Sequence, residues 1–191
     1  MSKQAVASKG GRGARQRILD TATELFYRDG INATGVERLA AESSVSKRTL
    51  YQHFPSKTAV VEEYLRGIED RVANPQQGTD QTPRERLLAV FQAPTSWGGP
   101  LRGCPFHNAA VESAGAMPGV QEIVRASKRS FINGLAELAK QAGVAHPQQL
   151  GNELGVLYEG AAALATSLDD SSPWAYAREA AESLIDNALH H

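Results

Sequence analysis

The sequence predicts an all-α protein of about nine helices, and three observations support that prediction. Apolar side chains recur at helical spacing through most of the 191 residues, as they do on the buried face of a helix. No run alternates apolar and polar residues as a half-buried strand does, and no hairpin dipeptide separates two such runs. Prolines and glycines interrupt the helical stretches, so the chain divides into successive helices.

The N-terminal part of the chain is expected to hold a disordered arm and then short helices. Residues 1–11 are small and polar, as in a disordered basic arm. A second helix is expected from Val36, with Thr34 as its N-cap and Glu37 at the capping-box position. The first helix is expected over 12–28, with an apolar stripe of Ile18, Leu19, Ala22, Leu25 and Phe26.

The next two helices are expected to begin at serines. Ser46 precedes a helix over 47–53, and Pro55 ends that helix because the residue before a proline avoids helical geometry. Ser56 is the expected cap of a fourth helix, 56–73. Beyond a polar loop, further helices are expected at 84–93, 101–115, 118–142, 148–167 and 173–189.

The composition narrows the class of protein. A hydrophobic content of 41% is too high for a disordered chain, and this length allows a substantial core. One cysteine permits neither an intramolecular disulfide nor a cysteine metal cage. No metal-ligand spacing or glycine-rich phosphate loop is present either, so no metal and no cofactor are expected. No apolar run approaches the ~20 residues of a membrane span, and none follows the basic N-terminus as in a secretory signal. A cytoplasmic protein is therefore expected.

The charge is unevenly distributed along the chain. Residues 1–57 hold 10 Lys and Arg against 5 Asp and Glu, a net charge of +5. Residues 58–191 hold 10 Lys and Arg against 16 Asp and Glu, a net charge of −6. A basic end on an acidic protein favours a polyanionic partner such as nucleic acid. The alternative is a solvated basic tail.

Residues 36–53 have the spacing of a helix-turn-helix unit, in which the second helix enters the major groove. Lysine and arginine there reach guanine or phosphate, glutamine reads adenine, and hydroxyl groups bind phosphate. An ordinary polar helix face is the alternative interpretation. The candidate DNA-contacting residues of the second helix are Lys47, Arg48, Thr49, Tyr51, Gln52 and His53.

From Arg12 to about Leu65 the sequence resembles the TetR family of transcriptional regulators. The family pattern T-L-Y-x-x-F-x-x-K is matched by T-L-Y-Q-H-F-P-S-K, which runs from Thr49 to Lys57. The resemblance implies that Thr49, Tyr51 and Lys57 bind phosphates and that Lys47, Arg48, Gln52 and His53 face the groove. It also implies that Leu50 and Phe54 belong to the core. Arg48 stands where many relatives carry glycine, so its position facing the groove leaves open a base or a phosphate contact, and the family assigns it no specific role.

The resemblance also implies a two-part organisation. A DNA-binding domain would span 12–55, an effector-binding and dimerisation domain would span 56–191, and the helix at 56–73 would connect them. The last two helices would form a four-helix bundle with those of a second copy. The alternative is that they pack within one subunit. Small residues expected at that interface are Gly151, Gly155, Gly160, Ala161, Ala162 and Ala163. Apolar residues expected there are Leu154, Leu157, Leu164, Leu184, Ile185 and Leu189.

The segment from Gly103 to Glu112 is similar to a pattern in one subgroup of the family, G-C-P-F-x-N-A-A-x-E. The resemblance implies that its helix borders an effector pocket. A largely apolar cavity is expected between the fifth and eighth helices. The candidate ligand-binding residues are Phe91, Trp97, Cys104, Phe106, His107, Met117, Phe131 and Tyr158.

The sequence therefore predicts a dimeric repressor that binds a palindromic operator and is released by a small-molecule effector. The alternative is a thiol-based redox sensor that uses Cys104. A remote alternative is an all-helical enzyme or carrier. The chain lacks the metal-ligand spacing, glycine-rich phosphate loop and nucleophile elbow of such enzymes. Cys104 and His107 stand at helical spacing, but no third group with motif spacing orients them.

Overall fold

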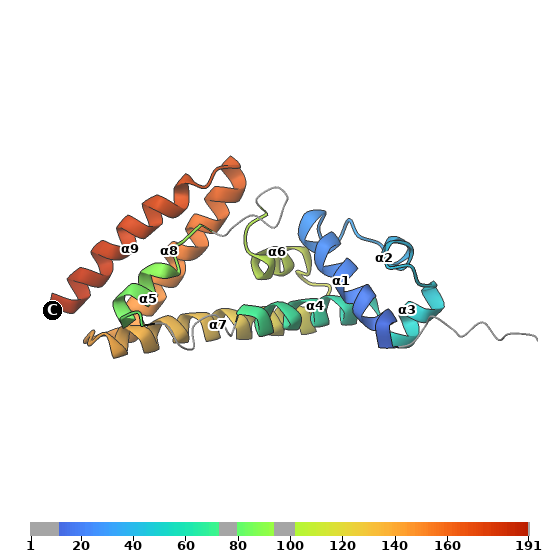
Figure 1. Cartoon of the computed structure of the whole chain (residues 1–191), viewed down its shortest axis with the longest axis horizontal. Helices are drawn as coiled ribbons and strands as arrows, with labels where there is room; N and C mark the ends of the chain where they lie inside the picture. Colours follow the sequence, from blue (N-terminus) through green and yellow to red (C-terminus); the bar gives the residue numbers. More distant parts are fainter. Residues whose placement is uncertain (1–11, 73–79, 94–101, 191) are drawn as a thin grey trace, which may run out of the picture.

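The computed structural model describes residues 12–72, 80–93 and 102–190, and this part of the chain forms nine helices. The predicted all-α class is confirmed. The short N-terminal helices lie at one end of an elongated molecule and α9 lies at the other (Figure 1). The helices are α1 (Arg12–Arg28), α2 (Val36–Glu42), α3 (Lys47–His53), α4 (Lys57–Val72), α5 (Pro83–Ala89), α6 (Pro105–Glu112), α7 (Pro118–Gln141), α8 (Pro147–Leu168) and α9 (Ser172–His190).

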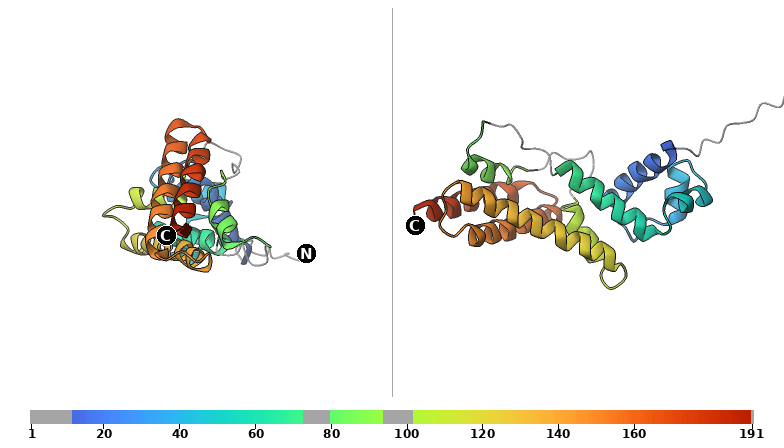
Figure 2. Two further views of the ribbon diagram at one scale, coloured as in Figure 1. Left: turned by 90° about the vertical axis from the view of Figure 1, so that its left-hand side faces the viewer. Right: turned by 90° about the horizontal axis from the view of Figure 1, so that it is seen from below.

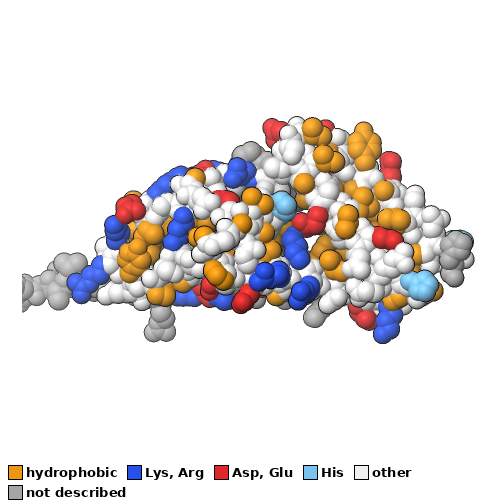
Figure 3. Space-filling model, turned by 180° about the vertical axis from the view of Figure 1, so that it is seen from behind, with side chains coloured by type: hydrophobic (Ala, Val, Ile, Leu, Met, Phe, Trp, Pro, Cys, Tyr) orange, Lys and Arg blue, Asp and Glu red, His pale blue; other side chains and the backbone are white. Residues whose placement is uncertain are grey.

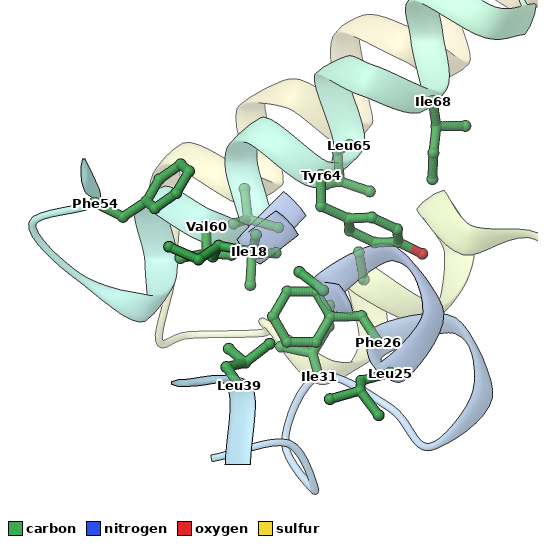
Figure 4. Close-up of a cluster of buried hydrophobic side chains, with 14 of the residues drawn as sticks. Ile18, Leu25, Phe26, Ile31, Leu39, Phe54, Val60, Tyr64, Leu65 and Ile68 are labelled. Atoms are coloured by element: carbon green, nitrogen blue, oxygen red, sulfur yellow. The ribbon is translucent and has the colours of Figure 1, made fainter. Parts of the chain in front are cut away.

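The first buried cluster joins α1–α4 to α6 and the start of α7. Phe26 and Tyr64 meet edge to face, with 5.5 Å between ring centroids, at its centre (Figure 4). Phe106 and Ala109 bring the apolar face of α6 into the same cluster. The helix-turn-helix unit therefore shares its core with α6, a helix that lies about 50 residues further along the chain.

The second buried cluster joins α5, α8, α9 and the C-terminal half of α7. Its centre is aromatic: the Tyr158 ring lies 4.8 Å from Phe131, 5.1 Å from Trp174 and 6.4 Å from Phe91, between centroids. Edge-on and tilted pairs of this kind stabilise a core beyond the area that they bury.

Helix α7 connects the two clusters. Val120 and Val124 near its start belong to the first cluster, and Leu135 and Ala139 near its end belong to the second. The helix runs lengthwise along the molecule between them (Figures 1 and 2). None of the helices formed by the described residues combines the length and apolar content that a membrane crossing requires.

The expected helix caps are confirmed at two serines and wrong at Thr34. The Ser46 hydroxyl accepts a hydrogen bond from the Thr49 N–H at 3.0 Å, and the Ser56 hydroxyl accepts from the Ala59 N–H at 3.1 Å. Gly35, not Thr34, is the N-cap of α2, and it has no side chain to bond. Thr34 is fully buried and donates its hydroxyl proton to the carbonyl of Gly30 at 2.8 Å instead. The hydrogen bond from Thr34 to Gly30 thus closes the turn that precedes α2.

Helix α6 is shorter than the expected 101–115. It begins at Pro105, with Cys104 as its N-cap, and ends at Glu112. Gly103 has a φ of +69°, in the left-handed region, so a right-handed helix cannot run through it. Helix α5 also ends early, at Ala89 rather than 93, in a turn closed by the Phe91 N–H and the Leu88 carbonyl.

Several small residues that were expected at a dimer interface instead pack inside the chain. A Cβ on Gly151 would lie 2.9 Å from the backbone nitrogen of Ala136, and one on Gly155 would lie 2.9 Å from Ile132. These glycines therefore permit the close approach of α8 to α7. Four other residues of the expected interface are likewise buried within the chain: Leu154, Ala161, Ala162 and Ile185.

Candidate nucleic-acid interface

Helix α3 buries one face and exposes the other. Leu50 is fully buried, and Phe54, which caps the helix, is 2% exposed, as expected for core residues. The helix lies near one end of the molecule (Figure 1). Tyr51 is 48% exposed although tyrosine is a large side chain. Among the other candidates, Lys47, Arg48 and Gln52 are exposed, and Thr49 and His53 are half-buried.

Helix α2 holds α3 in place through the turn between them. The Val45 N–H donates to the carbonyl of Ala40 at 3.0 Å, and Arg17 on α1 donates to the carbonyl of Ser43 at 3.2 Å. An ion pair of 2.7 Å joins Glu37 on α2 to Lys47 on α3. These contacts fix the angle at which α3 leaves the core.

Two of the basic residues have a carboxylate near them. The hydrogen bond and charge of Glu37 raise the pKa of Lys47. Lys57 begins α4 and is half-buried, so burial lowers its pKa, while the charge of Glu112 acts in the opposite direction. The role of Glu112 could not be read from the sequence because it lies 55 positions beyond Lys57.

In the view of Figure 3, basic side chains lie over the N-terminal helices at the left and around the middle of the molecule, and few lie toward the other end. The Arg15 guanidinium lies 5.2 Å from the centroid of the Phe54 ring and also pairs with Glu63 on α4. An arginine over an aromatic face is held in a defined position while it keeps its charge. The uneven charge found along the sequence is thus uneven in space as well.

The candidate ligand-binding residues are divided between the two buried clusters. Cys104, Phe106 and Met117 contact the first cluster. Phe91, Phe131 and Tyr158 form the aromatic centre of the second. His107 on α6 has a side chain that is 56% exposed. Trp97 lies outside the described residues.

A polar cluster lies where the two buried clusters meet. Lys128 on α7 donates to the sulfur of Cys104 at 3.2 Å and forms an ion pair with Glu159 on α8. The other carboxylate oxygen of Glu159 lies 3.9 Å from Nδ1 of His107. We call Cys104, His107, Lys128 and Glu159 the polar junction. Burial raises the pKa of the neighbouring Tyr158 to about 12, so its hydroxyl is neutral.

Sequence reasoning missed Lys128 and Glu159, although a signal for each was present. Lys128 stands four residues after Val124 and three before Phe131, on the apolar stripe of its helix. Glu159 stands in the same way between Gly155 and Ala162 on α8. A charge on a buried stripe requires a partner, and here each residue is the partner of the other.

A hollow of about 230 Å³ lies far from the polar junction, where the α7–α8 turn meets the end of α9. It shares no residue with the candidate ligand-binding set. It is lined by Val144, Ala145, His146, Gln149, Leu150, Glu153, Leu184, Asn187 and Ala188.

Comparison with known proteins agrees with this arrangement. Residues 18–64 match the family model "Bacterial regulatory proteins, tetR family", and residues 83–181 match "Tetracyclin repressor-like, C-terminal domain". The transcriptional repressor KstR2 of Rhodococcus jostii is 40% identical over 63 residues, which are 33% of this chain and 31% of KstR2. The match thus spans about a third of the length of that curated relative.

Two solved structures resemble nearly the whole chain. SCO4454, a TetR-family regulator of Streptomyces coelicolor, is 27% identical with a TM-score of 0.77, covering 94% of this chain and 98% of its own. A TetR-family regulator of Cytophaga hutchinsonii has the same fold, with 22% identity and a TM-score of 0.81, covering 97% and 98% of the two chains. The helix-turn-helix unit and the helical C-terminal part thus match in sequence and in fold, and the chain belongs to the TetR family of transcriptional regulators, which are not enzymes.

Proposed function

We propose that the protein is a dimeric repressor that binds a palindromic operator in the cytoplasm and is released by a small organic effector. The observation that supports this most directly is the face of α3, where two cations, an amide and a phenol are exposed over the fully buried Leu50. A helix held in this way inserts into the major groove as a rigid element.

The residues divide by their chemistry into groups that contact bases and groups that contact phosphates. Lys47, Arg48, Gln52 and His53 face the bases, with Gln52 suited to adenine and Arg48 to guanine or phosphate. Thr49 and Tyr51 donate hydroxyl protons to phosphates. Lys57 binds a phosphate at the N-terminus of α4, where the helix end adds unpaired N–H groups and a partial positive charge.

An exposed apolar stripe supports dimerisation through α8 and α9. Val156, Leu164 and Leu168 on α8 are 75%, 55% and 61% exposed, and Tyr176 on α9 is 69% exposed. Residues 156, 160, 163, 164 and 168 repeat at helical spacing, so they form one face of α8. This face, rather than the buried face with Gly151, is the proposed contact with a second copy. Two-fold symmetry would then match that of a palindrome.

The effector site is proposed at the polar junction. A ligand bound between α6, α7 and α8 would contact both buried clusters, with Phe131 and Tyr158 offering apolar surface. Lys128 and Glu159 form an ion pair with each other, and either side chain can instead bind a polar group of a ligand. An apolar or mildly polar organic molecule fits this mixture of groups.

Selection of duplexes from a random-sequence pool tests the DNA-binding part. The expected product is an inverted repeat, bound by two protomers, with affinity that falls steeply as salt rises. Sedimentation of the free protein should show a dimer at micromolar concentration. Selection of no duplex, or of sequences without inverted symmetry, would contradict the proposal.

The second candidate function is a redox-sensing repressor, and the Lys128–Cys104 contact of 3.2 Å favours it. Cations beside a sulfur are typical of reactive cysteines. Under this alternative, an oxidant such as hydrogen peroxide converts the Cys104 thiol to a sulfenic acid, and the peroxide is reduced to water. Release of DNA would then depend on Cys104.

A further inference from the structure

The last residue of α6 binds the turn that precedes the helix-turn-helix unit. The backbone N–H of Asn32 donates to Oε2 of Glu112 at 2.7 Å. The side-chain amide of Asn32 donates to the backbone carbonyl of Glu112 at 3.0 Å. Two hydrogen bonds thus join residues that lie 80 positions apart, and one of them involves a charged acceptor, which strengthens it.

Gly30 permits this contact. Its φ is +99°, and a Cβ placed there would lie 3.1 Å from both carboxylate oxygens of Glu112. The carboxylate therefore lies directly against the backbone of the turn, at a residue whose positive φ favours glycine. We call Gly30, Asn32 and Glu112 the α6 clasp.

The turn held by the α6 clasp leads directly to the recognition helix. Asp29, one residue before Gly30, forms an ion pair of 2.6 Å with Arg38 on α2. The Glu37–Lys47 ion pair then connects α2 to α3. Because α2 and α3 also share the first buried cluster and are joined by the Val45–Ala40 hydrogen bond, a displacement of the turn would displace both helices.

The start of α6 is fastened to α1. Arg102 donates from Nε to the carbonyl of Tyr27 at 3.2 Å, and the side-chain amide of Asn108 donates to the carbonyl of Arg102 at 2.6 Å. Between the two attachments, Phe106 and Ala109 are buried in the first cluster. Helix α6 thus holds the end of α1 and the following turn at two points.

We propose that Glu112 is a positioning residue for operator binding. By holding the α1–α2 turn against α6, it fixes the orientation of α2 and α3 relative to the dimer and thereby the separation of the two recognition helices. Helix α6 begins at the polar junction and ends, eight residues and about 12 Å later, at Glu112. This inference rests on the proposed function.

The test measures how strictly the protein requires one half-site spacing. The probes are a duplex selected by the wild-type protein from a random pool and versions with one or two base pairs inserted between the half-sites. Each inserted pair moves a half-site by about 3.4 Å and rotates it by about a tenth of a turn. Dissociation constants are measured by fluorescence anisotropy at one salt concentration.

We expect Glu112→Ala to bind the selected duplex about tenfold more weakly, which corresponds to ~1.4 kcal/mol, and to lose most of its preference for the selected spacing. Glu112→Gln retains an oxygen that accepts from Asn32 and should keep most of that preference. Asn32→Ala removes only the bond to the backbone carbonyl and should reduce the preference partly. Glu122→Ala, a change of an exposed glutamate on α7, is the matched control and should behave like wild type.

The outcomes separate this inference from the function on which it rests. If the wild-type protein selects no duplex, the proposed function fails. If it selects one and Glu112→Ala retains the wild-type spacing preference, the positioning role is wrong. A loss of affinity equal at every spacing would also overturn it, because a general loss of folded protein has that effect. Asn32→Ala removes an exposed side chain, so it keeps the test decisive if Glu112→Ala fails to fold.

Discussion

The ammonium of Lys47, the first residue of α3, lies 2.7 Å from a carboxylate oxygen of Glu37 on α2. The side chain of Lys47 is 55% exposed and that of Glu37 is 74% exposed, so the pair lies on the surface that would face DNA. A phosphate or a guanine must therefore compete with Glu37 for the same cation. The pair strengthens the brace between α2 and α3 but opposes binding of a polyanion.

Glu37→Gln should therefore increase the affinity for duplex DNA. We expect an increase of about two- to fivefold, because exposed ion pairs are weak and screened by salt. The increase should shrink as salt rises, which anisotropy titrations at several salt concentrations would measure. Glu24→Gln, which removes an exposed carboxylate paired with Arg28 on α1, is the control. Equal gains from both variants would mean that net charge, not release of Lys47, raises the affinity.

Lys57→Ala should weaken binding to all duplex sequences and reduce the slope of log affinity against log salt by about one. The reason is the loss of one phosphate contact, which carries no sequence information. Gln52→Ala should instead relax the sequence preference while leaving the salt slope unchanged. A change of preference in Lys57→Ala at unchanged affinity would show that the two roles are assigned wrongly.

Leu164→Asp should convert the dimer into a folded monomer. Leu164 is 55% exposed on the apolar stripe of α8, and a charge buried there on association would lack a partner. Sedimentation equilibrium measures the result, and circular dichroism checks that the helices persist. Val111→Asp makes the same change at a residue on α6 that is 66% exposed and should leave the dimer intact. A dimeric Leu164→Asp protein would exclude the stripe as the interface.

Asp29 should contribute to stability in a pH-dependent way. The hydrogen bond from Arg28, with help from Arg38, lowers its pKa from 3.8 to about 2. A lowered folded-state pKa stabilises the protein above the unfolded value, and this contribution disappears as the pH falls from about 4 to about 2. The free energy of unfolding of Asp29→Asn should therefore approach that of wild type over this range. A difference that stays constant in urea titrations would contradict this.

Cys104→Ser separates the two proposed modes of release. If a reversible organic effector binds at the polar junction, hydrogen peroxide should leave the DNA complex of both proteins intact in a gel-shift series. If Cys104 is a redox sensor, peroxide should release the wild-type protein and not the variant. Peroxide-driven release that disappears in Cys104→Ser would overturn the preference for a reversible effector.

Local rules predicted the elements of the fold well and the contacts between distant elements poorly. Ser46 and Leu50 could be assigned from spacing because a cap and a buried stripe depend on neighbouring residues. Thr34 was misassigned because its hydroxyl had two possible partners at short range, and the turn at Gly30 decided between them. Gly151 was placed on the wrong face because a small residue permits close approach of any helix, from the same chain or another.

The candidate sites show the same contrast between residues on one element, which the sequence identifies, and contacts between distant elements, which it does not. The polar face of α3 could be identified from one short motif, since all its residues lie on one helix. Glu112 binds a residue 80 positions away, so only the packing of α6 on α1 reveals its partner. Lys128 and Glu159 lie on apolar stripes of separate helices, and pairing them required the register of α7 against α8.

Because α7 runs without interruption through both buried clusters, a movement at one end of this helix is carried to the other. Its 24 residues span about 36 Å as a stiff rod, anchored at one end among the aromatic rings and at the other beneath the DNA-binding helices. A tilt of only about 5° would displace the far end by roughly 3 Å, close to the rise of one base pair. Because Val120 and Val124 pack this end of α7 into the first cluster, the DNA-binding helices would move with it, far enough to put a recognition helix out of step with its half-site.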